Sequence, residues 1–158
     1  MRIGFASDIH RLVEDRKLIL GGVVIPYHLG ELAHSDGDVV YHALAESILG
    51  ALALGDLGTH FPDSDSQYKD IDSAILVQKV VAMMFDKGYE VNNVDISITL
   101  EEPKLKSFIP LMRENIASLL KVKIDAVSIK AGTNEKLDAI GNLLAVKAES
   151  IILLKEKE

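Results

Sequence analysis

Asp8 and His10 follow an apolar run, residues 3–6, close to the start of the chain. In an extended chain, residues i and i+2 project to the same side, so a carboxylate and an imidazole point together from the end of the first predicted strand. The pair is either a solvated loop pair without a role or one part of a metal site.

A second group of ionisable residues lies on a predicted helix over residues 39–54. This helix is apolar almost all round, so we expect it to be buried. Asp38, His42 and Glu46 recur every four residues and form one stripe. Burying three ionisable groups costs several kcal/mol unless they pair with one another or bind a metal. A partly exposed stripe and a self-contained hydrogen-bond chain are both open, but the sharper prediction is that His42 is a metal ligand oriented by its neighbours.

Asp8, His10 and His42 together would offer one oxygen and two nitrogen ligands. This set suits Zn²⁺ with a fourth position open, which is the mark of a catalytic zinc site. The chain has no cysteine, which excludes disulfides, a thiol nucleophile and thiolate-bound zinc.

Two later segments, EEPKLK (residues 101–106) and KAGTNEK (residues 130–136), could contact an anion. Lys104 is either an anion contact or a solvated side chain. The small residues around Thr133 can present backbone N–H groups to a phosphate, and Glu135 could hold a hard cation such as Mg²⁺ through phosphate oxygens. Ordinary turns have a similar composition, so these segments alone do not decide between the readings.

Hydrophobic periodicity and turn residues predict the elements that must position these groups. We expect a strand over 2–7, a hairpin of 17–20 and 23–27, a helix over 39–54, a loop over 55–69, a helix from 70 or 72 to about 87, a strand over 91–100, a helix over 107–120, a strand over 126–131, a helical turn over 136–141 and a strand over 144–154. This order predicts an α/β (α+β) fold in which helices pack on one face of a mostly four-stranded sheet with a small β-hairpin added.

Length and composition limit the class of protein. The 158 residues, 48% hydrophobic, predict a single domain over 1–158 with a substantial core. A net charge of −7 argues against a nucleic-acid partner, and a small anionic substrate would need a metal or local lysines. We recognise neither an apolar stretch long enough for a membrane span nor a signal peptide, so we expect a cytoplasmic protein without a membrane partner.

Taken together, these motifs resemble those of the 2-C-methyl-D-erythritol 2,4-cyclodiphosphate synthase family of the non-mevalonate isoprenoid pathway. The resemblance rests on DIHRL at 8–12, the ordered string from Leu20 to Asp65, EEPKL at 101–105 and TNEKL at 133–137, and it covers essentially the whole chain. It implies a ferredoxin-like two-layer sandwich and a homotrimer with active sites between neighbouring subunits.

The resemblance also implies the reaction. The 2-phosphate of 4-diphosphocytidyl-2-C-methyl-D-erythritol 2-phosphate attacks the β-phosphorus of the same molecule, CMP leaves, and a cyclic diphosphate remains. Such a reaction needs no covalent nucleophile from the protein, because the attacking group belongs to the substrate. It needs cations that offset the repulsion between two anions and hold them in line.

The resemblance further implies a role for particular residues. Asp8, His10 and His42 correspond to divalent-metal ligands, expected to bind Zn²⁺, and Glu135 to the ligand of a second metal, Mg²⁺ or Mn²⁺, held with the diphosphate. His34 and Thr133 correspond to catalytic residues that stabilise the reacting phosphates. The substrate-binding residues are expected to be Asp8, Ile9, His10, His34, Ser35, Asp56, Leu57, Gly58, Phe61, Pro62, Asp63, Ser64, Asp65, Leu100, Glu101, Glu102, Pro103, Lys104, Leu105, Lys106, Gly132, Thr133, Asn134 and Glu135.

Three positions depart from the family pattern. Glu46 replaces the usual Asp, and Gly132 replaces a usual Thr. Asn142 lies in the stretch DAIGNLLAV, where the family has an arginine associated with an anion site on the trimer axis. We therefore expect isoprenyl diphosphates to bind weakly or not at all at that axis.

Two other functions fit part of the pattern. One is a different divalent-metal-dependent phosphohydrolase or phosphotransferase, which could use the same ligands. The other is a trimeric binding module with a structural metal, which would need neither of the segments at 100–106 and 132–135.

Overall fold

The fold was analysed in a computed structural model that describes residues 1–62 and 64–157. Its main sheet has five strands in the order β4-β1-β7-β5-β6. The β5–β6 pair is parallel and the other neighbouring pairs are antiparallel. The strands of this sheet are β1 (Arg2–Val13), β4 (Gly30–Leu32), β5 (Tyr89–Thr99), β6 (Val127–Gly132) and β7 (Ala145–Glu156). A separate antiparallel hairpin consists of β2 (Leu18–Leu20) and β3 (Val23–Ile25).

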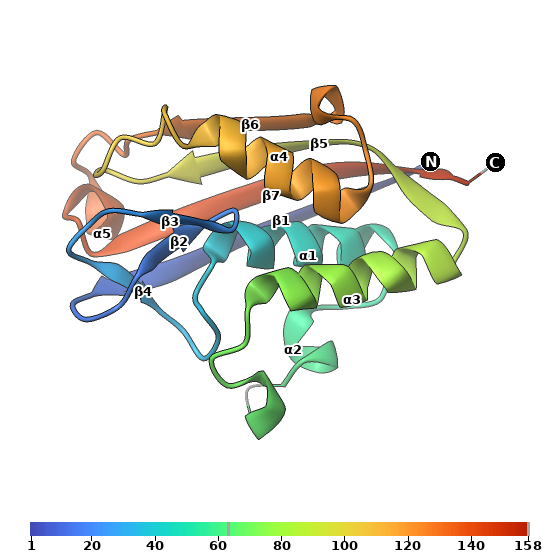
Figure 1. The fold of residues 1–158 in the computed structure, drawn as a ribbon, viewed down its shortest axis with the longest axis horizontal. Helices are drawn as coiled ribbons and strands as arrows, with labels where there is room; N and C mark the ends of the chain where they lie inside the picture. The colour runs from blue at the N-terminus through green and yellow to red at the C-terminus, as the bar shows by residue number, and fades with distance from the viewer. Residues whose placement is uncertain (63, 158) are drawn as a thin grey trace.

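The long helices lie on one side of the sheet (Figure 1). α1 packs against β1 and β7, α4 against β6, and α3 against α1 and α4. β1 and α1 approach so closely that a Cβ on Gly4 would lie 1.9 Å from the backbone oxygen of Ser47. The helices are α1 (Val39–Ala51), α2 (Leu57–His60), α3 (Ser73–Asp86), α4 (Ile109–Leu120) and α5 (Asp138–Gly141), with 3₁₀ turns η1 (Ser66–Tyr68) and η2 (Ile124–Ala126).

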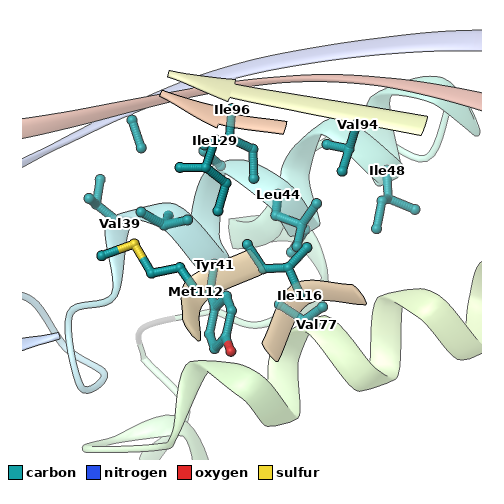
Figure 2. Close-up of a cluster of buried hydrophobic side chains, with 14 of the residues drawn as sticks. Val39, Tyr41, Leu44, Ile48, Val77, Val94, Ile96, Met112, Ile116 and Ile129 are labelled. Carbon is teal, nitrogen blue, oxygen red and sulfur yellow. The ribbon is translucent and has the colours of Figure 1, made fainter. Parts of the chain in front are cut away.

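The hydrophobic core lies between the helices and the sheet, and it is mainly aliphatic. α1 is buried along nearly its whole length, as its apolar sequence predicts. Side chains from α1, α3, α4 and the inner face of β5 and β6 meet in this layer (Figure 2). They include Val39, Tyr41, Leu44, Ile48, Val77, Val94, Ile96, Met112, Ile116 and Ile129.

The opposite face of the sheet is uncovered in the single chain. Residues of β1 alternate between the two faces, so Ile3, Phe5 and Ile9 point away from the helices and are 71%, 59% and 54% exposed. On β7, Ile151 is the cross-strand partner of Phe5 and is also exposed. This chain therefore exposes apolar side chains on a sheet face, a feature typical of an interface.

The predicted elements are present, but several boundaries differ. β1 does not end near residue 7; it continues to Val13, so Asp8 and His10 lie within a strand instead of beyond its end. The sheet has a fifth strand, β4, which is only three residues long and too short to give a periodic signal. The predicted loop over 55–69 contains α2 and η1, each capped by an aspartate, Asp56 and Asp65.

Candidate active site

Asp8, His10 and His42 converge where β1 crosses the start of α1. Asp8 and His10 project from the inner face of β1, and His42 lies in the first turn of α1. Asp8 Oδ2 is 3.1 Å from His10 Nε2 and 3.4 Å from His42 Nδ1, and these two nitrogens are 3.4 Å apart. The three side chains form a candidate metal site, as the sequence predicts.

The spacing of these atoms fits a divalent metal. Ligands about 2.0–2.1 Å from a zinc ion at the corners of a tetrahedron lie roughly 3.3–3.4 Å apart. The three observed separations of 3.1, 3.4 and 3.4 Å are close to this value. The donor set, two nitrogens and one carboxylate, also leaves a fourth position for another ligand.

Hydrogen bonds outside the trio determine which nitrogen of His10 can bind a cation. His10 Nδ1 lies 2.7 Å from the carbonyl oxygen of Gly37. A carbonyl only accepts, so Nδ1 carries the hydrogen and donates it. Nε2 of the neutral ring is then the atom with a free electron pair, and it is the nitrogen that faces Asp8 and His42.

A chain of hydroxyl and carboxylate groups orients His42 in a similar way. Ser73 Oγ donates to Asp36 Oδ1 at 2.5 Å, which uses its only hydrogen. The same oxygen, 2.9 Å from His42 Nε2, must therefore accept a hydrogen bond from that nitrogen. Ser35 Oγ lies 3.0 Å from the same Nε2. His42 Nδ1 is left with its electron pair directed toward Asp8 and His10.

The carboxylates around His10 give the centre a strong attraction for positive charge. Burial raises the pKa of Asp8, but the imidazoles of His10 and His42 beside it outweigh this effect and hold it well below its usual value. Burial lowers the pKa of His10, but Asp8 and Glu31 outweigh it and raise it to about 10. Burial raises the pKa of Glu31 to about 7, with His10 acting in the opposite direction. Metal binding would replace the proton on His10 Nε2.

The trio lines a cavity of about 330 Å³, here called the metal hollow. His34 also lines it, and its buried Nε2 has no hydrogen-bond partner in the part of the chain that the structure describes. A buried imidazole nitrogen in this situation is suited to a ligand, because buried polar atoms are nearly always paired. Other lining residues include Ser35, Glu46, Leu57, Gly58 and Phe61.

Of the remaining predicted residues near the metal hollow, several have local structural roles. Asp56 caps α2 by accepting hydrogen bonds from Thr59, and Asp65 caps η1. Pro62 and Ser64 are exposed, and Asp63 lies outside the described residues. The side chain of Ile9 lies on the uncovered face of the sheet, because it alternates with Asp8 and His10.

The two later segments meet at one edge of the sheet. Residues 100–106 follow β5 and residues 133–135 follow β6, and these strands are parallel neighbours. Glu101 Oε2 accepts a hydrogen bond from the backbone N–H of Asn134 at 3.1 Å, which ties the segments together. Glu102, Thr133 and Glu135 are exposed.

A cavity of about 290 Å³, here called the second hollow, lies between these segments. Of the predicted residues, it is lined by Leu100, Glu101, Pro103, Lys104, Leu105, Lys106, Gly132 and Thr133. No residue lines both the second hollow and the metal hollow among those that the structure describes. The two hollows are therefore lined by separate groups of predicted site residues.

The proposed stripe of Asp38, His42 and Glu46 is not one functional unit. Asp38 is fully buried as the N-cap of α1, and it accepts hydrogen bonds from four backbone N–H groups, those of Gly21, Gly22, Val40 and Tyr41. Glu46 accepts a hydrogen bond from the N–H of Leu57. The expectation that these neighbours orient His42 is wrong, since Ser35 and Ser73 contact its outer nitrogen.

Known proteins are similar to this chain over nearly its whole length. The profile of the YgbB family matches residues 1–155. A relative from Brachyspira hyodysenteriae, a 2-C-methyl-D-erythritol 2,4-cyclodiphosphate synthase, is 55% identical over 156 residues, which cover 99% of both chains.

Solved structures extend the comparison to the fold. An IspF of Plasmodium falciparum in complex with CDP has a TM-score of 0.87 and 37% identity, and the match covers 99% of this chain and 97% of that one. The bifunctional IspDF of Campylobacter jejuni has a TM-score of 0.95 and 38% identity; the match covers 99% of this chain but 42% of that longer one.

Proposed function

Since the chain belongs to the YgbB family, we propose that it closes a cyclic diphosphate at the metal hollow with the help of the second hollow. Its activity is that of a 2-C-methyl-D-erythritol 2,4-cyclodiphosphate synthase, a cyclising lyase of isoprenoid biosynthesis. The observation that carries the proposal is the convergence of Asp8, His10 and His42 in a cavity beside His34.

In the proposed reaction, an oxygen of the substrate's 2-phosphate forms a bond to the β-phosphorus. The bond from that phosphorus to the oxygen shared with the α-phosphorus breaks, and CMP leaves with that oxygen. The protein's task is to bring two anions together and hold them in line, which can remove roughly 7–11 kcal/mol from a barrier in the best intramolecular cases. No protein nucleophile takes part.

Asp8, His10 and His42 would hold Zn²⁺, and Glu135 would hold Mg²⁺ or Mn²⁺ with the diphosphate. When bound, these cations neutralise phosphate charge and favour the in-line geometry. His34 would donate a hydrogen bond to a phosphate oxygen at the metal hollow, and this is supported by its buried Nε2, which has no hydrogen-bond partner among the described residues. Asp56, Gly58 and the segment 61–65 would surround the methylerythritol portion of the substrate.

The second hollow is proposed to bind the cytidine diphosphate portion. Lys104 and Lys106 supply positive charge there, and Thr133 offers a hydroxyl to a phosphate oxygen. Support comes from the related Plasmodium falciparum protein, which was solved as a complex with CDP. The two lysines also help an acidic chain of net charge −7 to bind a diphosphate.

We propose that the chain works as a homotrimer and that the active site forms where the metal hollow of one subunit meets the second hollow of the next. Two observations support this. The hollows share no lining residue among those described. The uncovered sheet face exposes Ile3, Phe5, Ile9 and Ile151, which a partner subunit would bury.

Three further expectations belong to the proposal. Residues 1–158 would form one cyclodiphosphate synthase domain, supported by a family match over 1–155. The ferredoxin-like description of the fold and the cytoplasmic location stay predictions. Among the described residues, no helix has the length and apolar composition that a membrane span requires.

The activity can be tested with the purified chain, the cytidine diphosphate substrate and Mg²⁺. We expect CMP and the cyclic diphosphate to appear in equal amounts. Chromatography and ³¹P NMR measure the two products. A chelator should abolish both products, and added Zn²⁺ with Mg²⁺ should restore them.

Other outcomes would contradict the proposal. CMP without the cyclic product would indicate a phosphohydrolase. Metal binding without CMP would indicate a binding module. An unchanged rate after complete metal removal would exclude the proposed metal chemistry.

A further inference from the structure

Glu31 is a fully buried carboxylate at the edge of the main sheet, and it is neither a proposed metal ligand nor a proposed substrate contact. It lies on β4, where it pairs with Leu12 of β1 and has an exposed fraction of 0%. Its Oε1 accepts a hydrogen bond from the N–H of Val39 at 3.1 Å. Its Oε2 has no hydrogen-bond partner among the described residues. Burying a half-satisfied carboxylate is costly, so its charge calls for an explanation.

Capping of α1 does not provide that explanation. Asp38 already occupies the N-cap and binds the N–H groups of Val40 and Tyr41. The remaining contact of Glu31 with the Val39 N–H needs only a neutral acceptor, such as an amide oxygen. A neutral side chain of the same shape could therefore serve the helix at a lower desolvation cost.

The negative charge of Glu31 can act on the neighbouring ring of His10. Its ring lies between two carboxylates, with Nε2 3.1 Å from Asp8 Oδ2 and Nδ1 3.5 Å from Glu31 Oε1. The hydrogen on Nδ1 is donated to Gly37 at 2.7 Å, so the longer contact with Glu31 acts through charge instead of a hydrogen bond. Negative charge behind a histidine ring makes its other nitrogen a stronger ligand for a cation.

We infer that Glu31 is a positioning residue of the metal centre, whose buried carboxylate polarises His10 from behind and tightens the binding of a divalent cation at Nε2. This inference rests on the proposed metal at Asp8, His10 and His42. Glu31 would not touch the metal or the substrate. Its negative charge, added to that of Asp8, would offset the double charge of the ion within a buried site.

The test compares Glu31→Gln with Glu114→Gln. The first keeps the size and an acceptor for the Val39 N–H but removes the buried charge. The second removes one negative charge from an exposed position on α4, so the net charge changes equally. Zn²⁺ affinity is measured by competition with a chromophoric chelator, Co²⁺ binding by its visible spectrum, and folding by chemical denaturation of the metal-free proteins.

We expect Glu31→Gln to weaken the binding of both metals about tenfold, within the range of outer-shell substitutions. Glu114→Gln should leave both affinities unchanged. If Glu31→Gln unfolds, Glu31→Leu provides the same comparison, because it removes the charge without burying an unpaired amide.

The outcomes separate this inference from the proposed function. A wild-type chain that binds neither metal would refute the metal site itself. A wild-type chain that binds them with the same affinity as folded Glu31→Gln or Glu31→Leu would overturn only the role of Glu31. Equal weakening in Glu114→Gln would also overturn it, because it would reveal a general effect of net charge.

Discussion

At the scale of single residues, the candidate metal centre depends on groups that never reach the metal position. The carbonyl of Gly37 takes the hydrogen of His10 Nδ1, and Ser73 takes that of His42 Nε2 because its own hydrogen goes to Asp36. These bonds direct His10 Nε2 and His42 Nδ1 toward the metal position. The ligands are therefore arranged before any metal binds, which lowers the cost of forming the site.

His42→Ala tests the ligand assignment. We expect metal content to fall from about one ion per chain to near zero and turnover to fall at least about 10³-fold, because several kcal/mol of charge stabilisation is lost. Metal analysis and CMP release measure the two effects. His28→Ala, a change at an exposed histidine, is the matched control and should retain both. Full metal occupancy in folded His42→Ala would show that the assignment is wrong.

Ser73→Ala tests the orientation of His42. The variant keeps all three ligands but removes the acceptor at 2.9 Å from His42 Nε2, so we expect metal affinity to fall about tenfold. Ser47→Ala is the control, because it deletes an equally buried hydroxyl that instead bonds to Leu44 and Ser150. If the two variants bind metal with the same affinity as wild type, the hydrogen-bond chain has no such role.

The sequence predicts the metal ligands better than it predicts the residues that orient them. Asp8 and His10 are two residues apart on a strand, and a local period suffices to place them together. Ser73 and Glu31 come from elements far away in the sequence, and their types alone indicate nothing about a metal. Only the crossing of β1, β4, α1 and α3 brings them to the histidines.

At the scale of elements, the start of α1 is held by the neighbouring β2–β3 hairpin. Asp38 binds two amides of its own helix and the N–H groups of Gly21 and Gly22 in the hairpin turn. Both glycines have positive φ angles, 57° and 73°, which a turn of this kind requires. A residue expected to orient His42 thus instead joins two elements, and it fixes the end of the helix that carries His42.

Asp38→Ala should destabilise the fold by about 3 kcal/mol or more, because four N–H groups, most of them buried, lose their acceptor. Asp38→Asn, which keeps one oxygen, should cost about 1–2 kcal/mol. Asp72→Ala is the comparison, since Asp72 caps α3 through a single exposed hydrogen bond, and it should cost about 1 kcal/mol. Denaturant unfolding measures all three. A cost for Asp38→Ala no larger than that for Asp72→Ala would contradict the joining role.

The predicted and the observed elements differ where the sequence has no clear hydrophobic periodicity. α1, α3, α4 and the strands β5, β6 and β7 have strong local patterns and lie close to their expected positions. β1 continues past residue 7 because its polar inner residues, Asp8 and His10, are paired with one another instead of with water. β4 forms because Leu12 and its neighbours supply a strand edge, which no property of residues 30–32 reveals.

At the scale of the whole molecule, assembly into a trimer would explain two features of the single chain. Its metal hollow and second hollow are lined by separate residues, and one face of its sheet is apolar and uncovered. In a cyclic trimer every boundary is heterologous, so one subunit presents its first face and the next presents its second. Such an assembly would bury the sheet face and bring a metal hollow to each second hollow.

Subunit mixing tests this central claim most directly. One inactive variant, His42→Ala, lacks the metal half, and another, Lys104→Ala with Thr133→Ala, lacks the nucleotide half. After the two are unfolded and refolded together in equal amounts, about one boundary in four should combine both intact halves. We therefore expect CMP release at about a quarter of the wild-type rate.

The control mixes His42→Ala with Asp8→Ala in the same way, which should restore nothing because every boundary lacks an intact metal half. Native mass spectrometry verifies that mixed trimers form. Return of activity in the first mixture alone is the result that we predict. Activity at background in mixed trimers of the first mixture, or a chain that never forms trimers, would contradict an active site shared between subunits.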